Sequence, residues 1–99
     1  MSERLLAGDP EEGGAFLVNE AVAHREIEGQ VVLLLPDDYE LYTLNGSGKL
    51  VWGELVGGRT ADQIVARLAE TYAIPLERAR LDVAALLQEL ELRGVIRRA

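Results

Sequence analysis

The sequence predicts an α+β domain in which a three-stranded antiparallel sheet is followed by three helices. Short apolar or β-branched runs occupy residues 22–27, 31–35 and 39–44, and turn-forming residues separate them. After Leu44 the apolar spacing changes from a period of two to a period of about 3.6 residues, which is that of an α-helix. Three such amphipathic stretches follow before Gly94.

The three predicted strands differ in their apolar pattern. Residues 31–35 are apolar at every position, which is typical of a strand covered on both faces. Residues 22–27 alternate with polar side chains such as His24 and Arg25, and residues 39–44 form an apolar, aromatic-rich run. We therefore expect the middle run to be the central strand, with the other two at the edges.

Capping residues mark the predicted helix boundaries. Asn45 is expected to cap the first helix, which ends at Gly57-Gly58. Thr60 and Gln63 have the spacing of a capping box at the start of the second helix. The third helix is expected to begin near Pro75 and to end before Gly94, after which Val95-Ile96 returns to the core.

The third predicted helix carries two apolar faces on a helical wheel. One broad arc holds Leu76, Ala79, Val83, Leu86, Leu87 and Leu90. A second arc, nearly opposite, holds Leu81, Ala85 and Leu92. We expect the first face to pack on the other helices, and the second face to be either covered by the sheet or left for a partner.

The N-terminal region differs from the rest in composition. Residues 1–20 hold five acidic residues and one Arg, with a Gly- and Pro-containing cluster at residues 8–14, and we expect them to form an acidic flexible tail. Residues 21–99 then form the domain. Of the formal net charge of −7, the tail supplies −4 (one Arg minus five acids), so the domain carries about −3.

The composition excludes several kinds of chemistry. The 99 residues are enough for one small domain, and the absence of cysteine excludes a thiol nucleophile, a disulfide framework and a Cys-rich zinc site. Residues 1–20 lack the basic start and apolar centre typical of a signal peptide, and the sequence has no apolar run long enough to cross a membrane. We expect a non-enzymatic cytoplasmic protein that uses no cofactor or metal and does not bind membranes.

Three local patterns could be mistaken for functional motifs. Gly46-Ser47-Gly48-Lys49 resembles the end of a phosphate-binding loop, but Thr43 and Leu50 stand where that motif needs Gly and Ser or Thr. Asp37-Asp38 fits a turn better than a calcium loop. His24 has no predicted nucleophile or orienting acid beside it, so we expect a solvated histidine.

Three helices near a small sheet suggest a winged helix-turn-helix-like fold, which is often used to bind DNA. The third helix carries Arg78 and Arg80, but the acidic residues Glu77 and Asp82 lie on either side of them in the sequence. The net negative charge also opposes binding to a phosphate backbone. We expect no nucleic acid partner, and a winged-helix DNA-binding regulator stays as an alternative.

The predicted edge strand at residues 39–44 contains no Lys or Pro, although exposed edges are usually protected by such residues. An extended peptide could pair with this edge through backbone hydrogen bonds. The acidic tail or a second copy of the chain, in an edge-to-edge homodimer, could cover it instead. The residue pattern leaves these possibilities open.

The order of several weak signals resembles one family over residues 21–96. They are Leu44-Asn45, Leu50-Val51-Trp52, Leu55, Gly57-Gly58-Arg59-Thr60, residues 64–68, Tyr72, Glu77-Arg78-Ala79, Asp82-Val83, Leu86-Leu87, Leu90 and Gly94. This series is similar to that of the PqqD-like proteins, the peptide-recognition domains of ribosomally made and modified peptides, also called RiPP recognition elements. None of the signals is catalytic.

The resemblance implies a non-catalytic peptide chaperone. Such domains bind the leader region of a precursor peptide as an added strand, in the cleft beside the third helix, and present it to a modifying enzyme. The partner implied first is a radical-SAM maturase, and the alternative is a lasso-peptide leader peptidase. The residues matched to peptide binding are Tyr39, Glu40, Leu41, Tyr42, Thr43, Leu44, Arg78, Arg80, Val83, Ala84 and Leu87.

Within this set, Arg78 and Arg80 are the predicted ion-pair donors to acidic residues of a leader. Two departures from the family pattern affect helix starts. Gly46 and Gly48 occupy a turn that is often firmer in relatives, and Pro75 stands where many relatives have an Asp cap. Both loosen the expected register at a helix start but leave the cleft intact.

Overall fold

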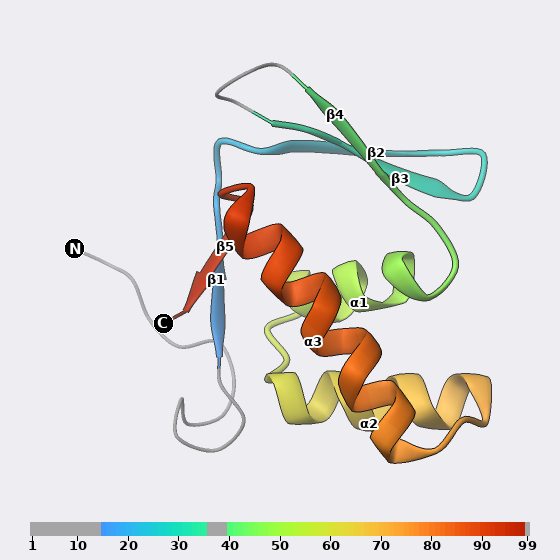
Figure 1. Ribbon diagram of the computed structural model, residues 1–99. Coiled ribbons are helices and arrows are strands. Elements are labelled where there is room, and N and C mark those ends of the chain that lie inside the picture. The colour runs from blue at the N-terminus through green and yellow to red at the C-terminus, as the bar shows by residue number, and fades with distance from the viewer. Residues whose placement is uncertain (1–14, 36–39, 99) are drawn as a thin grey trace.

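The computed structural model describes residues 15–35 and 40–98. Its elements, in chain order, are β1 (Phe16–Val18), β2 (Ala23–Ile27), β3 (Gln30–Leu34), β4 (Leu41–Leu44), α1 (Ser47–Val56), α2 (Ala61–Tyr72), α3 (Leu76–Leu92) and β5 (Ile96–Arg98). Strands β2, β3 and β4 form one sheet, and the three helices lie on one side of it (Figure 1). This confirms the predicted α+β architecture.

The three-stranded sheet is antiparallel with β3 in the centre, as predicted. The turn between β2 and β3 is tight because Glu28 and Gly29 both have positive φ, at 52° and 81°. Val31 and Leu33 of β3 are buried against the helices, whereas Leu34 is 37% exposed on the opposite face. The expectation that both faces of this strand are covered is therefore wrong, because the helices cover only one face of the sheet.

A second sheet, which the sequence analysis did not predict, joins the two ends of the described chain. β1 pairs antiparallel with β5, and Phe16 lies opposite Arg98. Phe16 is buried, and Val95 just before β5 is fully buried, which confirms the predicted return of residues 95–96 to the core. The predicted tail is therefore wrong for residues 16–18, which form a strand, while residues 1–14 lie outside the part that the structure describes.

The helix boundaries follow the predicted caps at two of three starts. The Gln63 backbone N–H donates to Thr60 Oγ1 at 3.3 Å, and the Thr60 N–H donates to Gln63 Oε1 at 2.9 Å, so the capping box is present. Pro75 precedes α3, also as predicted. The prediction of an Asn45 cap is wrong, because Gly46, with φ of 53°, takes the cap position and no side chain caps α1.

The helices and the inner face of the three-stranded sheet share one core, to which α3 contributes Ala79, Val83, Leu87 and Leu90. The second apolar face of α3 is in solvent: Leu81 is 66% and Leu92 is 77% exposed. Of the two expectations for this face, the structure excludes cover by the sheet. No helix among the described residues is both long and apolar enough to span a membrane.

Candidate functional site

β4 forms an edge of the three-stranded sheet, and its backbone is available on the outer side. The Leu35 N–H donates to the Glu40 carbonyl at 2.9 Å, and hydrogen-bonded pairs alternate along an antiparallel ladder. Tyr42 and Leu44 therefore direct their backbone groups toward β3, whereas Leu41 and Thr43 direct theirs away from it. Within the described ranges no strand pairs with this outer side.

The side chains of β4 alternate between the helices and solvent. Leu44 is buried and Tyr42 is half-buried against the core, while Leu41 is 64% exposed and Thr43 is exposed on the outer face. Glu40, just before the strand, is also exposed. The predicted edge strand is confirmed at residues 41–44, and Tyr39 lies outside the described residues.

One side of α3 approaches β4 and is lined by Leu86, Glu89 and Arg93. These residues follow a spacing of three and four, which places them on one face of a helix. A Cβ added to Gly48 of α1 would lie 3.2 Å from Leu44 Cδ2 and 3.9 Å from Leu86 Cδ2, so Leu86 lies close to the end of β4. We call the surface made by this face of α3 and the edge of β4 the candidate peptide groove.

Arg93 links the C-terminal end of α3 to the start of β4. Its Nε donates to Glu89 Oε2 at 2.6 Å and its Nη1 donates to Glu40 Oε1 at 3.3 Å. The guanidinium carbon lies 4.7 Å from the centre of the Tyr42 ring, a distance suited to a cation–π contact. The hydrogen bond that Arg93 donates to Glu89, together with the negative charges of Glu89 and Glu40, raises the pKa of Arg93 above its usual value.

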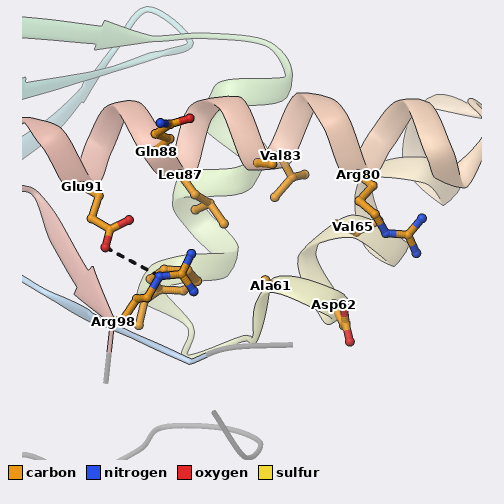
Figure 2. A pocket seen from close by; sticks show the side chains of 11 residues that line it. Ala61, Asp62, Val65, Arg80, Val83, Leu87, Gln88, Glu91 and Arg98 are labelled. Carbon is orange, nitrogen blue, oxygen red and sulfur yellow. Dashed lines mark ion pairs between the residues drawn. The ribbon is translucent and has the colours of Figure 1, made fainter. Parts of the chain in front are cut away.

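The four α3 residues predicted to face β4 lie on a different side of the helix. Arg80, Val83, Ala84 and Leu87 line a hollow of about 460 Å³ that is bordered by α2, β1 and β5 (Figure 2). The structure therefore does not bring them together with residues 41–44 in one groove. Arg78 also lies apart, with its Nε donating to Asp82 Oδ2 at 3.1 Å near the start of α3.

Leu86, Glu89 and Arg93 were the groove residues that sequence reasoning missed. The spacing of Glu89 and Arg93 could have indicated an ion pair on one helix. No local signal could have shown that this pair meets Glu40, which is 53 residues from Arg93 in the chain.

The described residues contain no group of three or more His, Cys, Asp or Glu side chains arranged to hold a metal ion. His24 is exposed on β2, and its ring lies 5.6 Å from that of Trp52 in an edge-on arrangement. This position agrees with the predicted solvated histidine. Asp37 and Asp38, considered above as cation ligands, lie outside the described residues.

The fold and part of the sequence match known proteins. A solved structure of TbiB1 in complex with the TbiA(beta) leader peptide is 23% identical, covers 80% of this chain and 92% of its own, and has a TM-score of 0.75. A lasso peptide synthetase B1 complexed with the leader peptide is also 23% identical, with coverages of 83% and 96% and a TM-score of 0.76. At this identity the likeness shows a shared fold.

No curated protein matches the chain, but the model of one protein family does. The family model for coenzyme PQQ synthesis protein D (PqqD) matches residues 30–96, which run from the start of β3 to the start of β5 and include β4 and all three helices. Since this match covers well over half of the sequence, the chain belongs to the PqqD family.

Proposed function

We propose that this protein binds the leader region of a ribosomally synthesised precursor peptide by strand addition to β4 and delivers it to a modifying enzyme, without being a catalyst itself. The observation that carries the proposal is the open edge of β4. Leu41 and Thr43 direct their backbone N–H and C=O groups away from β3, and these groups can pair with an extended peptide.

The groove gives such a peptide two different surroundings. Alternate side chains of an added strand point toward α3 or toward solvent, because side chains alternate along a strand. Those directed toward α3 would meet the half-buried Tyr42 and Leu86, and then Glu89 and Arg93 at the end of the helix. Backbone pairing would supply affinity, and these contacts would supply selectivity.

The comparisons support the proposal. Both of the similar solved structures hold a leader peptide, and the family match includes β4 and α3. The peptide-binding residues that we propose are Glu40, Leu41, Tyr42, Thr43, Leu44, Leu86, Glu89 and Arg93. The predicted contacts by Arg78, Arg80, Val83, Ala84 and Leu87 form a separate hypothesis, which the variants Arg80→Gln and Arg93→Gln distinguish from this one.

The direct experiment is a titration of the ¹⁵N-labelled full chain with a synthetic leader peptide of the precursor encoded beside its gene. We expect the largest amide shifts at Leu41–Leu44 of β4, with smaller ones at Leu86 and Arg93. A scrambled peptide of the same composition is the control. If the leader binds but leaves these amides unshifted, strand addition to β4 is wrong.

Two classes of enzyme are candidates for the client. We propose a radical-SAM maturase first, and a lasso-peptide leader peptidase is the second candidate because one of the similar structures is a lasso peptide synthetase B1. Size-exclusion chromatography of the chain with its leader and each purified enzyme separates these two. The client is the enzyme that co-elutes with the chain when the leader is present.

Two other functions have their own tests. On α3, Arg78 faces Asp82 and Arg93 faces Glu89, so these cations are paired with carboxylates and are poorly placed to bind DNA. Passage through a heparin column without retention is expected, and retention at moderate salt would favour a DNA-binding regulator. A homodimer joined through β4 would show a doubled mass that falls when leader peptide is added.

A further inference from the structure

The hollow on the other side of α3 is lined by apolar side chains and bordered by charged ones. Val83 and Leu87 of α3 face Val65 of α2 across it (Figure 2). Phe16 of β1 also lines it. Its volume of about 460 Å³ is large enough for two aliphatic side chains. Because the groove at β4 lies on a different side of α3, a ligand in this hollow leaves the groove free.

Charged side chains stand at two ends of this hollow (Figure 2). At one end Arg98 pairs with Glu91 at 3.7 Å, and its guanidinium lies 5.5 Å from the Phe16 ring centre. At the other end are Arg80 and Asp62, and neither takes part in an ion pair within the described part of the chain. This end offers one free charge of each sign to a ligand.

The path of the chain brings the N-terminal segment to this place. Phe16 forms one wall of the hollow, and Ala15 before it is only 2% exposed. Residues 1–14 precede this point and lie outside the described residues. They contain one pair of adjacent large apolar residues, Leu5-Leu6, directly preceded by one residue of each charge, Glu3-Arg4.

We propose that residues 3–6 dock in this hollow, with Leu5-Leu6 on its apolar walls and Glu3-Arg4 beside Arg80 and Asp62. The order of the residues fits the order of the surfaces from Phe16 across the apolar walls to the charged end. Leu6 is ten residues before Phe16, and a connection of this length reaches about 33 Å when extended, enough to cross the hollow. Residues 8–14 contain Gly and Pro, the residue types most common in turns, so their composition is compatible with a return path.

The driving force is the removal of the two leucines from water, since the apolar side chains around the hollow are already buried. The entropic cost of closing the connecting loop rises only slowly with its length, and the loop is anchored at β1. The charges favour one orientation, since Arg80 attracts Glu3 and Asp62 attracts Arg4. The proposal is independent of leader binding.

The test uses the absence of cysteine in the sequence, which allows a single site of labelling. A nitroxide is attached to the Ala7→Cys variant of the full chain, and the loss of NMR signal is measured for methyl groups. We expect Val65, Val83 and Leu87 to lose most of their intensity, while Val32 and Leu34 on the outer side of β3 keep theirs. Equal intensities at both places would overturn the proposal.

Two matched variants separate docking from mere proximity of the segment to β1. Leu5→Ser with Leu6→Ser should restore the intensities in the hollow, whereas Glu11→Ser with Glu12→Ser, in the same segment but outside the docking residues, should not. Equal effects of the two variants would contradict docking by Leu5-Leu6. A mixture of nitroxide-labelled chain and isotope-labelled chain without nitroxide should show no loss, and a loss there would assign the hollow to a second copy.

Discussion

Helix α3 has two sides that could contact a ligand, one toward β4 and one toward β1 and β5, and they offer different contacts. Toward β4, the helix lies beside a strand whose backbone groups at Leu41 and Thr43 point away from β3, and Arg93 connects the two elements through Glu40 and Tyr42. Toward β1 and β5, the helix borders a hollow with apolar walls, and the neighbouring strands β1 and β5 pair with each other.

This difference shows why one helix can take part in two kinds of binding. Strand addition needs a row of unpaired N–H and C=O groups, and no described strand pairs with the outer side of β4. A hollow without such a row selects side chains by volume and charge instead. Apolar residues of α3 border both the groove and the hollow. A ligand can therefore be assigned to one of these two places only by a variant that changes that place alone.

The largest effect is expected from Leu90→Ala, which lowers the stability of the whole domain and therefore affects both the groove and the hollow. Leu90 is fully buried in α3, and its truncation leaves a cavity that lowers the free energy of unfolding by about 2–5 kcal/mol. Urea unfolding followed by Trp52 fluorescence measures it. Leu92→Ala is the matched control, because Leu92 is 77% exposed and its loss should change stability by less than about 0.5 kcal/mol. Equal changes would contradict the assigned faces of α3.

Thr43→Pro is expected to have the next largest effect, and only on leader binding. Proline removes the outward N–H and places its ring where the added strand would lie, but it leaves the ladder to β3 in place. We expect a loss of more than about 2 kcal/mol of binding free energy, roughly 30-fold in Kd by calorimetry. Thr43→Val keeps the N–H and should bind normally. Unchanged binding by the proline variant would exclude pairing at Thr43.

Arg93→Gln should weaken leader binding less, by roughly threefold, because exposed ion pairs contribute little. The variant removes the charge that holds the start of β4 to α3 through Glu40 and Tyr42. The control is Arg78→Gln, which removes only a pair with Asp82 on the same helix. The Kd values of the two variants for the leader test whether Arg93 lies at the peptide-binding site. A greater loss of leader affinity from Arg78→Gln than from Arg93→Gln would contradict this.

The smallest effect on the leader is expected from Arg80→Gln. Arg80 lies at the hollow and not beside β4, so leader affinity should stay within about twofold, while the nitroxide-dependent signal loss at Val83 should decrease. The sequence-based hypothesis, in which Arg80 pairs with an acidic residue of the leader, expects the opposite order. If Arg80→Gln weakens the leader more than Arg93→Gln does, the leader binds on the side of the hollow.

Most of the fold could be predicted from the sequence because its signals are local. The turn at Glu28-Gly29, the capping box at Thr60 and the end of α3 before Gly94 each depend on residues within a few positions of one another. The prediction of an Asn45 cap failed because the next residue, Gly46, has a positive φ and takes the cap position itself. β1 was missed because its three residues have their partner about 80 positions later.

The candidate site was predictable in one half only. Residues 41–44 were identified because an apolar strand without Lys or Pro indicates an open edge. The α3 residues predicted for the site lie on another side of the helix, since a helical wheel orders residues around the axis but does not show which direction points toward the sheet. The hollow beside Arg80 depends in addition on β1, which the sequence analysis placed in the tail.

The sequence by itself determined the type and order of the central strands and helices, since periodicity and caps act over a few residues. It also determined which residues of α3 form its apolar faces. Only the tertiary structure decided that Arg93 meets Glu40 and Tyr42, that Phe16 lies opposite Arg98, and that Leu81 and Leu92 stay in solvent. These contacts depend on the angles at which the elements pack, and those angles are fixed by the whole core at once.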